Sequence, residues 1–281
     1  MTKLSAIPAP AVAGCVRERT AKAAVAEIKN CYYDGADMID LHLSCLEDSS
    51  VETLKKIISA SPLPVLALNY DQRYDRSRIH QTEEERVESF LRAIEAGAAG
   101  IDMQGYTFHI PSRGEFCGED RYSFTKDAPK EVVTDPAIIE KQCALIEKVH
   151  SMGAEVLLSC HPGVVMNTQQ VVDLVRFLKE RNPDIIKIVT KAVAPADCDE
   201  AIRTMTVLKR EFDFPVSYHA SGKAGIPSRL MNPLLGGQIA FCIDRYNEGS
   251  TMEQLDLRTV RSVVDGTRKL YGGSLCVKRY W

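Results

Sequence analysis

The sequence lacks any apolar run of about 18 residues, the length that a membrane-spanning helix needs, so we expect no transmembrane segment. Its N-terminus lacks the long apolar core of a secretory signal peptide. A surplus of positive charge is also missing, since 35 Lys and Arg residues face 38 Asp and Glu residues and the net charge is −3. Such a balance is not typical of proteins that bind nucleic acid. We therefore expect a cytoplasmic protein with no membrane or nucleic-acid partner.

Paired cysteine motifs are absent as well. The nine cysteines are scattered singly, without a CxxC pair, and their number is odd. This pattern predicts reduced thiols rather than a disulfide framework or a zinc site. The remaining composition is that of an ordinary globular protein, with 45% hydrophobic, 26% charged and 7% aromatic residues. A length of 281 residues fits one large domain, and α/β barrels often have it.

Short apolar runs alternate with amphipathic stretches along the chain. Eight runs have the length and composition of buried strands: 9–15, 37–44, 64–70, 99–105, 155–161, 184–190, 215–220 and 238–243. Helical patterns lie between and after them: 18–33, 51–60, 82–97, 135–152, 168–181, 196–212, 227–234 and 256–271. Eight strand-then-helix units predict a parallel sheet closed into a (β/α)8 barrel, with an open doubly wound sheet as the alternative. We expect residues 1–281 to form this single domain.

One long stretch, 106–134, shows neither pattern. Loops of this length inside a compact domain are usually functional or mobile. Because the stretch follows the fourth predicted strand, we expect it to lie over the mouth of the barrel, where it could act as a lid.

Polar side chains occur late in five of the predicted strands, at positions of one parity. Because side chains alternate along a strand, all of them can point inward at the C-terminal rim, where barrel enzymes keep their chemistry. An inert core would have Val, Ile or Leu there. The residues are Asp40, His42, Ser44, Asp102, Gln104, Ser159, His161, Lys187, Lys191, Ser217, His219 and Ser221. Together they predict an active site.

Lys187 lies in the middle of the apolar run DIIKIVTKA, residues 184–192. Burial disfavours the charged form, so apolar neighbours are expected to keep this amine neutral and nucleophilic. A neutral amine can form a Schiff base with a ketone or aldehyde, and the iminium acidifies the adjacent C–H. His161 is the candidate base, because imidazole titrates near neutral pH. Lys191 and Lys223 are rival nucleophiles, and an ion-paired structural lysine is the non-catalytic alternative.

The last third of the chain suggests an anion site. The segment SGKAGIPSR, residues 221–229, is rich in small residues and ends in Arg229 at a predicted helix start. Backbone N–H groups and a guanidinium suit a carboxylate or phosphate. Ser250 and Gln254 add a hydroxyl and an amide on the loop after the eighth strand. Turn formation alone is the alternative explanation.

These segments together resemble the type I 3-dehydroquinate dehydratase family over most of the chain, roughly residues 35–270. The resemblance is carried by GADMIDLHLS, LLSCH, PDIIKIV, GKAGIPSR and GSTMEQLDLRTVRSVV, each on the expected strand or loop. It implies a barrel lyase of the shikimate pathway of aromatic amino acid biosynthesis, without metal or cofactor. Such an enzyme dehydrates a cyclic hydroxyketo acid through a lysine Schiff base. By this resemblance Lys187 forms the Schiff base and His161 is the general acid and base. The implied substrate-binding residues are Arg229, Ser250 and Gln254.

The chain departs from the family's typical pattern on the side of the pocket that contacts the substrate hydroxyls. Asp40 and His42 stand where the family typically has Glu-x-Arg. Tyr70 replaces the arginine of a Thr-x-Arg pattern, and Asp102 and Gln104 replace Asp-x-Glu. An arginine fork and a tyrosine are not equivalent. The expected hydroxyl contacts are therefore Asp40, His42, Tyr70 and Gln104, and the expected substrate is 3-dehydroquinate or a closely related hydroxyketo acid.

Two other classes of function stay open. A class I aldolase would form the same iminium and break a C–C bond, with Asp40 or Tyr70 as the base. A non-catalytic small-molecule binder could keep the fold without the chemistry, although a binder has little need of the lysine and histidine pair. The expected partner is a small anionic keto acid, and the resemblance allows a homodimer.

Overall fold

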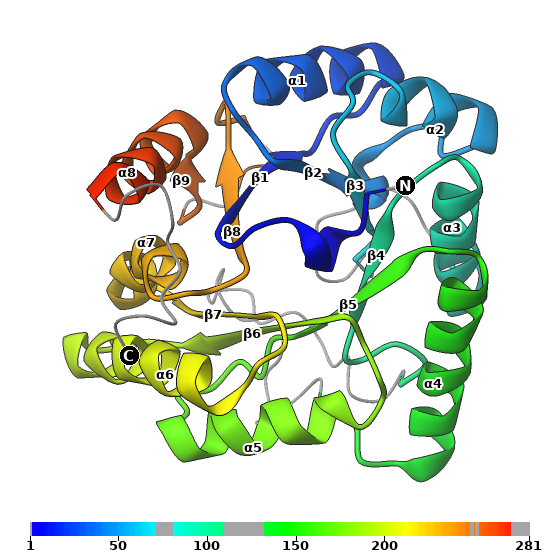
Figure 1. Cartoon of the computed structure of the whole chain (residues 1–281). Helices are drawn as coiled ribbons and strands as arrows, with labels where there is room; N and C mark the ends of the chain where they lie inside the picture. Colours follow the sequence, from blue (N-terminus) through cyan, green and yellow to red (C-terminus); the bar gives the residue numbers. More distant parts are fainter. Residues whose placement is uncertain (1, 71–80, 110–131, 248–249, 251–252, 271–281) are drawn as a thin grey trace.

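Parallel strands form a ring at the centre of the molecule, and helices surround it (Figure 1). This computed structural model describes residues 2–70, 81–109, 132–247, 250 and 253–270. Its strands are β1 (Ala11–Val16), β2 (Met38–His42), β3 (Val65–Leu68), β4 (Gly100–Gln104), β5 (Glu155–Cys160), β6 (Ile185–Lys191), β7 (Val216–Ser221), β8 (Ile239–Ile243) and the short β9 (Leu255–Asp256). All of the strand pairs are parallel, and the predicted (β/α)8 barrel fold is confirmed.

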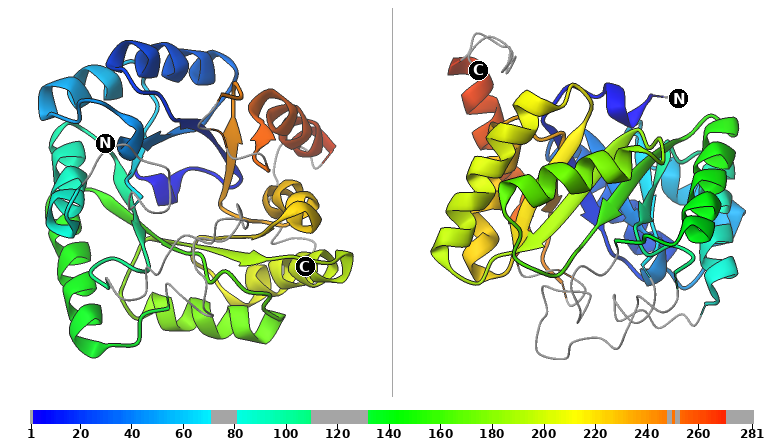
Figure 2. Two further views of the ribbon diagram at one scale, coloured as in Figure 1. Left: turned by 180° about the vertical axis from the view of Figure 1, so that it is seen from behind. Right: turned by 90° about the horizontal axis from the view of Figure 1, so that it is seen from below.

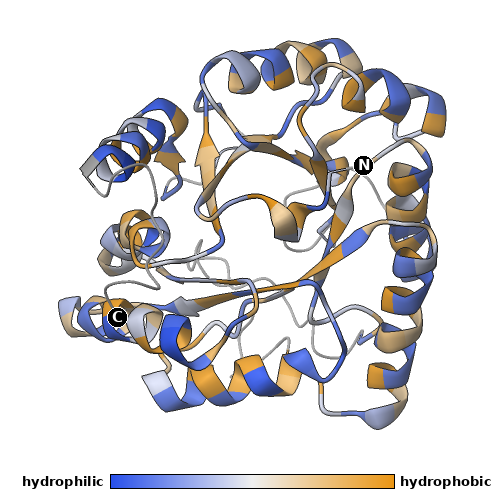
Figure 3. Cartoon of the chain, viewed as in Figure 1, coloured by the Kyte–Doolittle hydropathy of each residue, from blue (hydrophilic) through white to orange (hydrophobic). Residues whose placement is uncertain are grey.

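Each strand from β1 to β8 is followed by an α-helix. The helices are α1 (Ala21–Tyr33), α2 (Val51–Ile58), α3 (Glu83–Glu95), α4 (Pro136–Ser151), α5 (Thr168–Lys179), α6 (Pro195–Glu211), α7 (Ile226–Leu234) and α8 (Leu257–Leu270). Short 3-10 turns add η1 (Leu4–Ala6), η2 (Leu43–Cys45) and η4 (Lys223–Gly225). Polar and apolar segments alternate along the helices in Figure 3, as expected for helices with one face on the sheet.

Local capping signals explain where two of the helices begin. At the start of α3, the Thr82 hydroxyl accepts from the Glu85 N–H, and the Glu85 carboxylate accepts from the Thr82 N–H. This reciprocal pair satisfies two N–H groups that the helix cannot pair internally. At the start of α4, the Asp135 side chain accepts from the Ala137 N–H, and Pro136 occupies the first turn, where it needs no N–H.

The barrel has one seam where no continuous ladder forms. The strand order runs β7-β6-β5-β4-β3-β2-β1-β8-β9, so β7 and β8 meet without a ladder between them in the described part of the chain. The Gln238 N–H donates to the Val216 carbonyl at 3.0 Å. The Ser217 hydroxyl accepts from the Ile239 N–H at 2.8 Å and donates to the Ile239 carbonyl at 3.3 Å. A side chain therefore replaces backbone pairing where the barrel closes.

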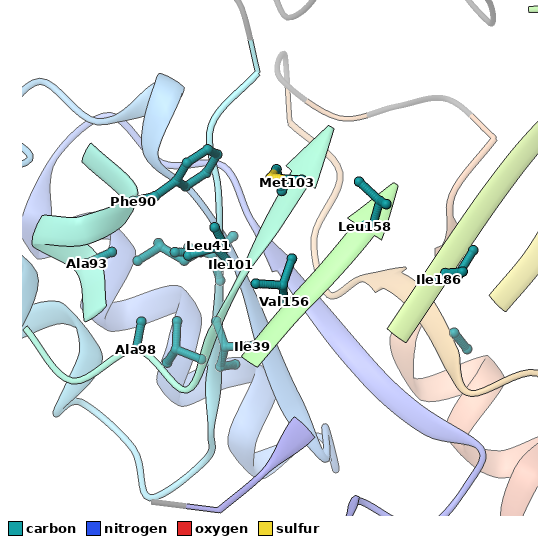
Figure 4. Packing of buried hydrophobic residues seen from close by; sticks show 14 of the residues in the cluster. Ile39, Leu41, Phe90, Ala93, Ala98, Ile101, Met103, Val156, Leu158 and Ile186 are labelled. Atoms are coloured by element: carbon teal, nitrogen blue, oxygen red, sulfur yellow. The ribbon is translucent and has the colours of Figure 1, made fainter. Parts of the chain in front are cut away.

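Alternating side chains of the strands form two apolar layers. The outward-facing side chains pack against the helices, and Figure 4 shows part of this layer. The residues labelled there are Ile39, Leu41, Phe90, Ala93, Ala98, Ile101, Met103, Val156, Leu158 and Ile186. Inward-facing residues near the N-terminal ends of the strands form a smaller second cluster: Ala11, Ala13, Met38, Leu66, Leu157, Ile185 and Ile239. This second cluster fills the interior of the barrel at that end.

The N-terminal segment covers the same end of the barrel (Figures 1 and 2). Leu4 is fully buried in the inner cluster, and Ser5 donates to the Glu155 carboxylate through its N–H at 2.9 Å and its hydroxyl at 2.5 Å. Gly100 allows this close approach, because a Cβ there would lie 2.5 Å from the Glu155 carbonyl oxygen and 2.7 Å from Leu4. Since apolar side chains close this end, the inward-facing polar residues lie toward the other.

Two predictions about the chain as a whole stay predictions. The stretch 106–134 was expected to lie over the barrel mouth, and residues 110–131 of it are outside the described residues. The assignment of residues 1–281 to one domain is likewise untested. Within the described residues, none of the helices combines the length and hydropathy needed to cross a bilayer.

The hydrogen bonds of Ser217 between β7 and β8 are expected to contribute to the stability of the barrel. Replacing Ser217 by Ala should lower the free energy of unfolding by about 1–3 kcal/mol, because the buried Ile239 N–H loses its acceptor. Urea unfolding of both proteins measures the difference. Ser59→Ala, at the exposed end of α2, is the control and should change stability by less than about 0.5 kcal/mol. Equal effects of the two substitutions would show that the Ser217 hydroxyl does not hold the seam.

Candidate active site

The inward-facing side chains change from apolar to polar toward the C-terminal ends of the strands. On β2, Met38 is followed on the same face by Asp40 and His42, and on β5 Leu157 is followed by Ser159. All five residues are buried. The polar residues that the sequence placed on one parity thus lie inside the protein, where each needs a partner.

Lys187 lies in the middle of β6 and is 5% exposed. Its Nζ is 2.9 Å from Oδ2 of Asp102 on β4, and 4.4 Å from the centre of the Phe241 ring on β8. Both contacts are typical of an ammonium. The predicted apolar surroundings of Lys187 therefore also include a carboxylate from 85 residues earlier in the chain, with which the lysine is ion-paired. A neutral amine has to arise by loss of a proton from this ion pair.

Asp102 can hold Lys187 because its own carboxylate is fixed in place. The Ser159 hydroxyl donates to Oδ1 at 2.5 Å, and the Gln104 amide donates to the backbone carbonyl of Asp102 at 2.6 Å. Three neighbouring strands supply these groups, and Ser159 on β5 is the register partner of Lys187 on β6. Each carboxylate oxygen has a donor, which offsets part of the cost of burying the charge.

Arg86 on α3 supports the site from outside the sheet, and sequence reasoning missed it. Its guanidinium pairs with the Glu83 carboxylate through Nε at 2.9 Å and Nη2 at 3.0 Å. It also donates to Gln104 Oε1 at 2.7 Å and to the Thr107 hydroxyl at 3.0 Å. Arg86 is 2% exposed and shares a helix face with Phe90, four residues later. A charged residue on an apolar helix face was the signal that could have revealed it.

His161 directly follows β5 and lies two residues beyond Ser159, so the two share the inward parity. Its Nε2 is 3.5 Å from the Tyr70 hydroxyl, and the two ring centres are 5.9 Å apart. Because Ser159 is the register partner of Lys187, His161 lies two residues further along, just past the end of the strand that pairs with β6. Strands in a sheet are about 4.8 Å apart, so one small substrate can reach both side chains. Gln104, predicted to contact hydroxyls, has its amide engaged elsewhere.

His219 on β7 adds another imidazole to this region. Burial lowers the pKa of His219 well below its ordinary value, and electrostatic interactions with Arg229, Lys187 and His161 lower it further. The imidazole is therefore neutral near pH 7. From the sequence, His219 was predicted only to be an inward-facing polar residue of its strand. Its neighbours could not be predicted, because they come from other elements.

Asp40 and His42 on β2 form a second polar group with Cys15 on β1. Asp40 Oδ2 lies 3.2 Å from His42 Nε2 and accepts from Cys15 Sγ at 3.3 Å. Burial acts to raise the pKa of Asp40, but the charge and hydrogen bond of His42, the charge of Lys187 and the Cys15 hydrogen bond together lower it. Burial and the charge of Asp40 raise the pKa of the Cys15 thiol, which stays protonated. The Gln254 amide donates to Cys15 Sγ at 3.1 Å.

The residues predicted to bind a substrate carboxylate make contacts within the chain. Arg229 Nη2 lies 3.2 Å from Oε1 of Glu253, whose Oε2 accepts from the Gly222 N–H at 2.9 Å. The Ser250 hydroxyl accepts from the Asn247 N–H at 2.8 Å and donates to the Asn247 side chain at 3.2 Å. Sequence reasoning missed Glu253, although it is an acidic residue inside the segment predicted to bind an anion. Glu253 places its carboxylate beside the guanidinium of Arg229, which was predicted to bind the substrate carboxylate.

The rival lysines differ from Lys187 in burial. Lys191 at the end of β6 is half-buried, and Lys223 in η4 is exposed. The structure therefore places one buried amine beside a fixed carboxylate, and the imidazole of His161 follows the adjacent strand β5. This set can condense with a carbonyl group and move protons at the adjacent carbon.

Comparisons with known proteins point to one family. The model of the type I 3-dehydroquinase family matches residues 130–269, about half of the chain. The curated 3-dehydroquinate dehydratase of Desulfotalea psychrophila is 20% identical over 229 residues, which cover 82% of this chain and 86% of that protein. The matched range includes Lys187, His161 and Arg229, whereas Asp40 and Tyr70 lie before it. The part with the unusual polar residues is thus also the part that the family model does not match.

Solved structures agree with this fold. The 3-dehydroquinate dehydratase of Geobacillus kaustophilus superposes with a TM-score of 0.74 at 15% identity, covering 96% of this chain and 99% of that one. The type I enzyme of Clostridium difficile, solved with covalently modified comenic acid, gives a TM-score of 0.73 at 15% identity and covers 96% of this chain and 98% of that one. Fold, matched segments and curated relatives lead to the same result: the chain is a divergent member of the type I 3-dehydroquinase family.

Proposed function

We propose that the chain is a lyase that dehydrates 3-dehydroquinate, or a closely related hydroxyketo acid, through a Schiff base on Lys187. Membership of the family supports this reaction class. The observation that carries the proposal is the buried amine of Lys187, held 2.9 Å from Asp102, with His161 directly after the neighbouring strand β5. The product is an α,β-unsaturated ketone such as 3-dehydroshikimate.

The proposed reaction begins when Lys187 loses a proton, for which the Asp102 carboxylate is an acceptor in place. The amine attacks the substrate ketone, and water leaves to form an iminium ion. His161 removes a proton from the adjacent carbon, and the electron pair forms an enamine. The enamine then expels the β-hydroxyl group, which takes the proton back from His161 and leaves as water. Hydrolysis of the remaining iminium releases the unsaturated ketone and free Lys187.

We assign the substrate hydroxyls to the side of the pocket that β2 and β3 form. Tyr70 is placed beside His161, so a hydroxyl bound there lies near the proposed base. Asp40 and His42 provide a buried acceptor and an imidazole on the same side. Gln104 has a different role in this proposal: it fixes Asp102 instead of contacting substrate.

The carboxylate side of the substrate requires a change in the site. We propose that Arg229, with Ser250 and Gln254, binds the substrate carboxylate, as the family resemblance implies. In the substrate-free protein Glu253 is paired with Arg229, so the two carboxylates compete for one guanidinium. Like charges this close disfavour each other, and Glu253 should weaken substrate binding.

The cellular setting is part of the proposal as well. We place the enzyme in the cytoplasm, and the free thiols of the seven described cysteines are compatible with a reducing compartment. We also propose that the chain works as one barrel domain with the stretch 106–134 over its mouth.

Trapping of the Schiff base tests the function directly. Borohydride reduction with 3-dehydroquinate should attach the substrate to the peptide that contains Lys187, as read by mass mapping. Lys187→Met should abolish the adduct and lower activity by more than about 10³-fold, because the nucleophile is gone. Lys187→Arg keeps a cation beside Asp102, so its loss of activity cannot be attributed to an unpaired buried carboxylate. Lys191→Met is the control, and Lys187 in this variant should still be labelled. Labelling of Lys191, or retro-aldol products instead of water loss, contradicts the proposal.

The role of His161 can be separated from that of Lys187. His161→Ala should lower kcat by about 10²–10⁴-fold, because proton transfer loses its base. Borohydride trapping should persist on long incubation, since the amine can still condense with the ketone. Tyr70→Phe removes only the hydroxyl near His161 and should cost less. If kcat of His161→Ala is unchanged, another group is the base.

Glu253 should act against carboxylate binding. Glu253→Gln is expected to lower KM for the carboxylated substrate by about 10-fold, because one negative charge beside the bound carboxylate is removed. Steady-state kinetics measure this, and the KM for the corresponding carboxamide should not change. Glu52→Gln, on the exposed surface of α2, is the control. An unchanged or higher KM for the acid would show that Arg229 does not bind it in competition with Glu253.

A further inference from the structure

Three donor atoms of different chemistry meet at the C-terminal ends of β1 and β2. One donor atom from each of Cys15, Asp40 and His42 lies within 4.8 Å of the other two. We propose that these three side chains bind a divalent transition-metal ion, with zinc as the best match. Metal bonds of 2.0–2.3 Å in a tetrahedron place neighbouring ligands about 3.3–3.7 Å apart. The Sγ to Oδ2 distance of 3.3 Å and the Oδ2 to Nε2 distance of 3.2 Å are already close to that spacing.

The scaffold that carries these donors is rigid. Cys15 and Asp40 are register partners in the ladder between β1 and β2, and His42 is the last residue of β2. Their exposed fractions are 5%, 2% and 1%. Ligands on paired strands are held in position before the ion arrives, which lowers the ordering cost of binding. This placement differs from a flexible surface cluster of acidic residues.

The donor set selects the kind of ion. A thiolate, an imidazole and a carboxylate are the ligands of zinc and its transition-metal neighbours, whereas calcium and magnesium prefer oxygen alone. Cys15 has to lose its thiol proton when the ion binds, and the resulting thiolate and the carboxylate of Asp40 carry two negative charges, which match a divalent cation. Three protein ligands leave a fourth position open, as in catalytic zinc sites.

Unsatisfied atoms next to the cluster point to a missing ligand. Within the described residues, Oδ1 of Asp40 and Oε1 of Gln254 are buried and lack a hydrogen-bond partner. The Gln254 amide lies against the cluster, with its nitrogen 3.1 Å from Cys15 Sγ. Rotating this amide by 180° exchanges its nitrogen and oxygen, which are assigned from the hydrogen-bond network. The rotated amide presents an oxygen to an ion bound by Cys15.

The ion would also change the site that the reaction uses, and this step rests on the proposed function. Asp40 and Lys187 interact electrostatically, so an ion bound at Asp40 would change the electrostatic environment of Lys187. Its open position can bind a substrate hydroxyl as a Lewis acid. The spacing of cysteines along the sequence gave no zinc motif because the donors come from two strands, 25 residues apart.

Cobalt substitution tests the site without using catalysis. Titrating metal-free protein with Co²⁺ should give one equivalent of tetrahedral d–d absorption and a thiolate-to-cobalt charge-transfer band, both removed by excess Zn²⁺. Cys15→Ser should lose the charge-transfer band, and His42→Ala should weaken binding by more than about 10-fold. Cys31→Ser on α1 is the matched control and should keep both signals. Persistence of the band in Cys15→Ser, or no cobalt binding by the wild type, overturns the proposal.

X-ray absorption of the zinc-loaded wild type gives a second readout that needs no variant. One sulfur at about 2.3 Å with nitrogen and oxygen at about 2.0–2.2 Å is expected. A shell of nitrogen and oxygen alone contradicts the site, even if a variant fails to fold. Neither experiment measures turnover, so a failure of the proposed dehydratase reaction and a failure of this metal site are distinguishable.

Discussion

The buried ion pair between Lys187 and Asp102 is the constraint on which the rest of the site depends. An ammonium and a carboxylate inside a barrel are costly unless each is fully bonded, so the surrounding residues have to complete the pair. Ser159 binds one carboxylate oxygen, and Gln104 fixes the backbone of Asp102. Arg86 then holds Gln104 from outside the sheet. The reactive amine is thus positioned by contacts that reach back to the helix layer.

Charges in the barrel mouth are compensated in pairs. Besides Lys187 with Asp102, Asp40 lies against His42 and Glu253 against Arg229. Each of these three carboxylates lies beside a cation or an imidazole. In the proposed function, an anionic substrate would displace Glu253 from Arg229, and formation of the neutral amine would remove the charge of Lys187. The proposed substrate binding, amine activation and metal binding at Asp40 would therefore be coupled through the same few charges.

Strands and helices could be predicted because their signals are local. Each predicted unit corresponds to an observed one, with ends shifted by a few residues, since alternation and capping groups such as Thr82 act within a few positions. The pairing of Lys187 with Asp102 could not be predicted, because the two residues are 85 positions apart in the chain. Arg86 and Glu253 were missed for a similar reason. Their roles come from contacts between a helix or loop and strands that the sequence does not show as neighbours.

The sequence by itself determined the eightfold strand and helix pattern, the inward parity of the polar residues and the resemblance that singled out Lys187 and His161. These follow from periodicity and short motifs, which depend on residues close together in the chain. Only the tertiary structure decided which charges meet: Asp102 with Lys187, Glu253 with Arg229, and Cys15 with Asp40 and His42. Strand register and barrel closure bring these groups together, and electrostatic interactions depend on distance in space rather than along the chain.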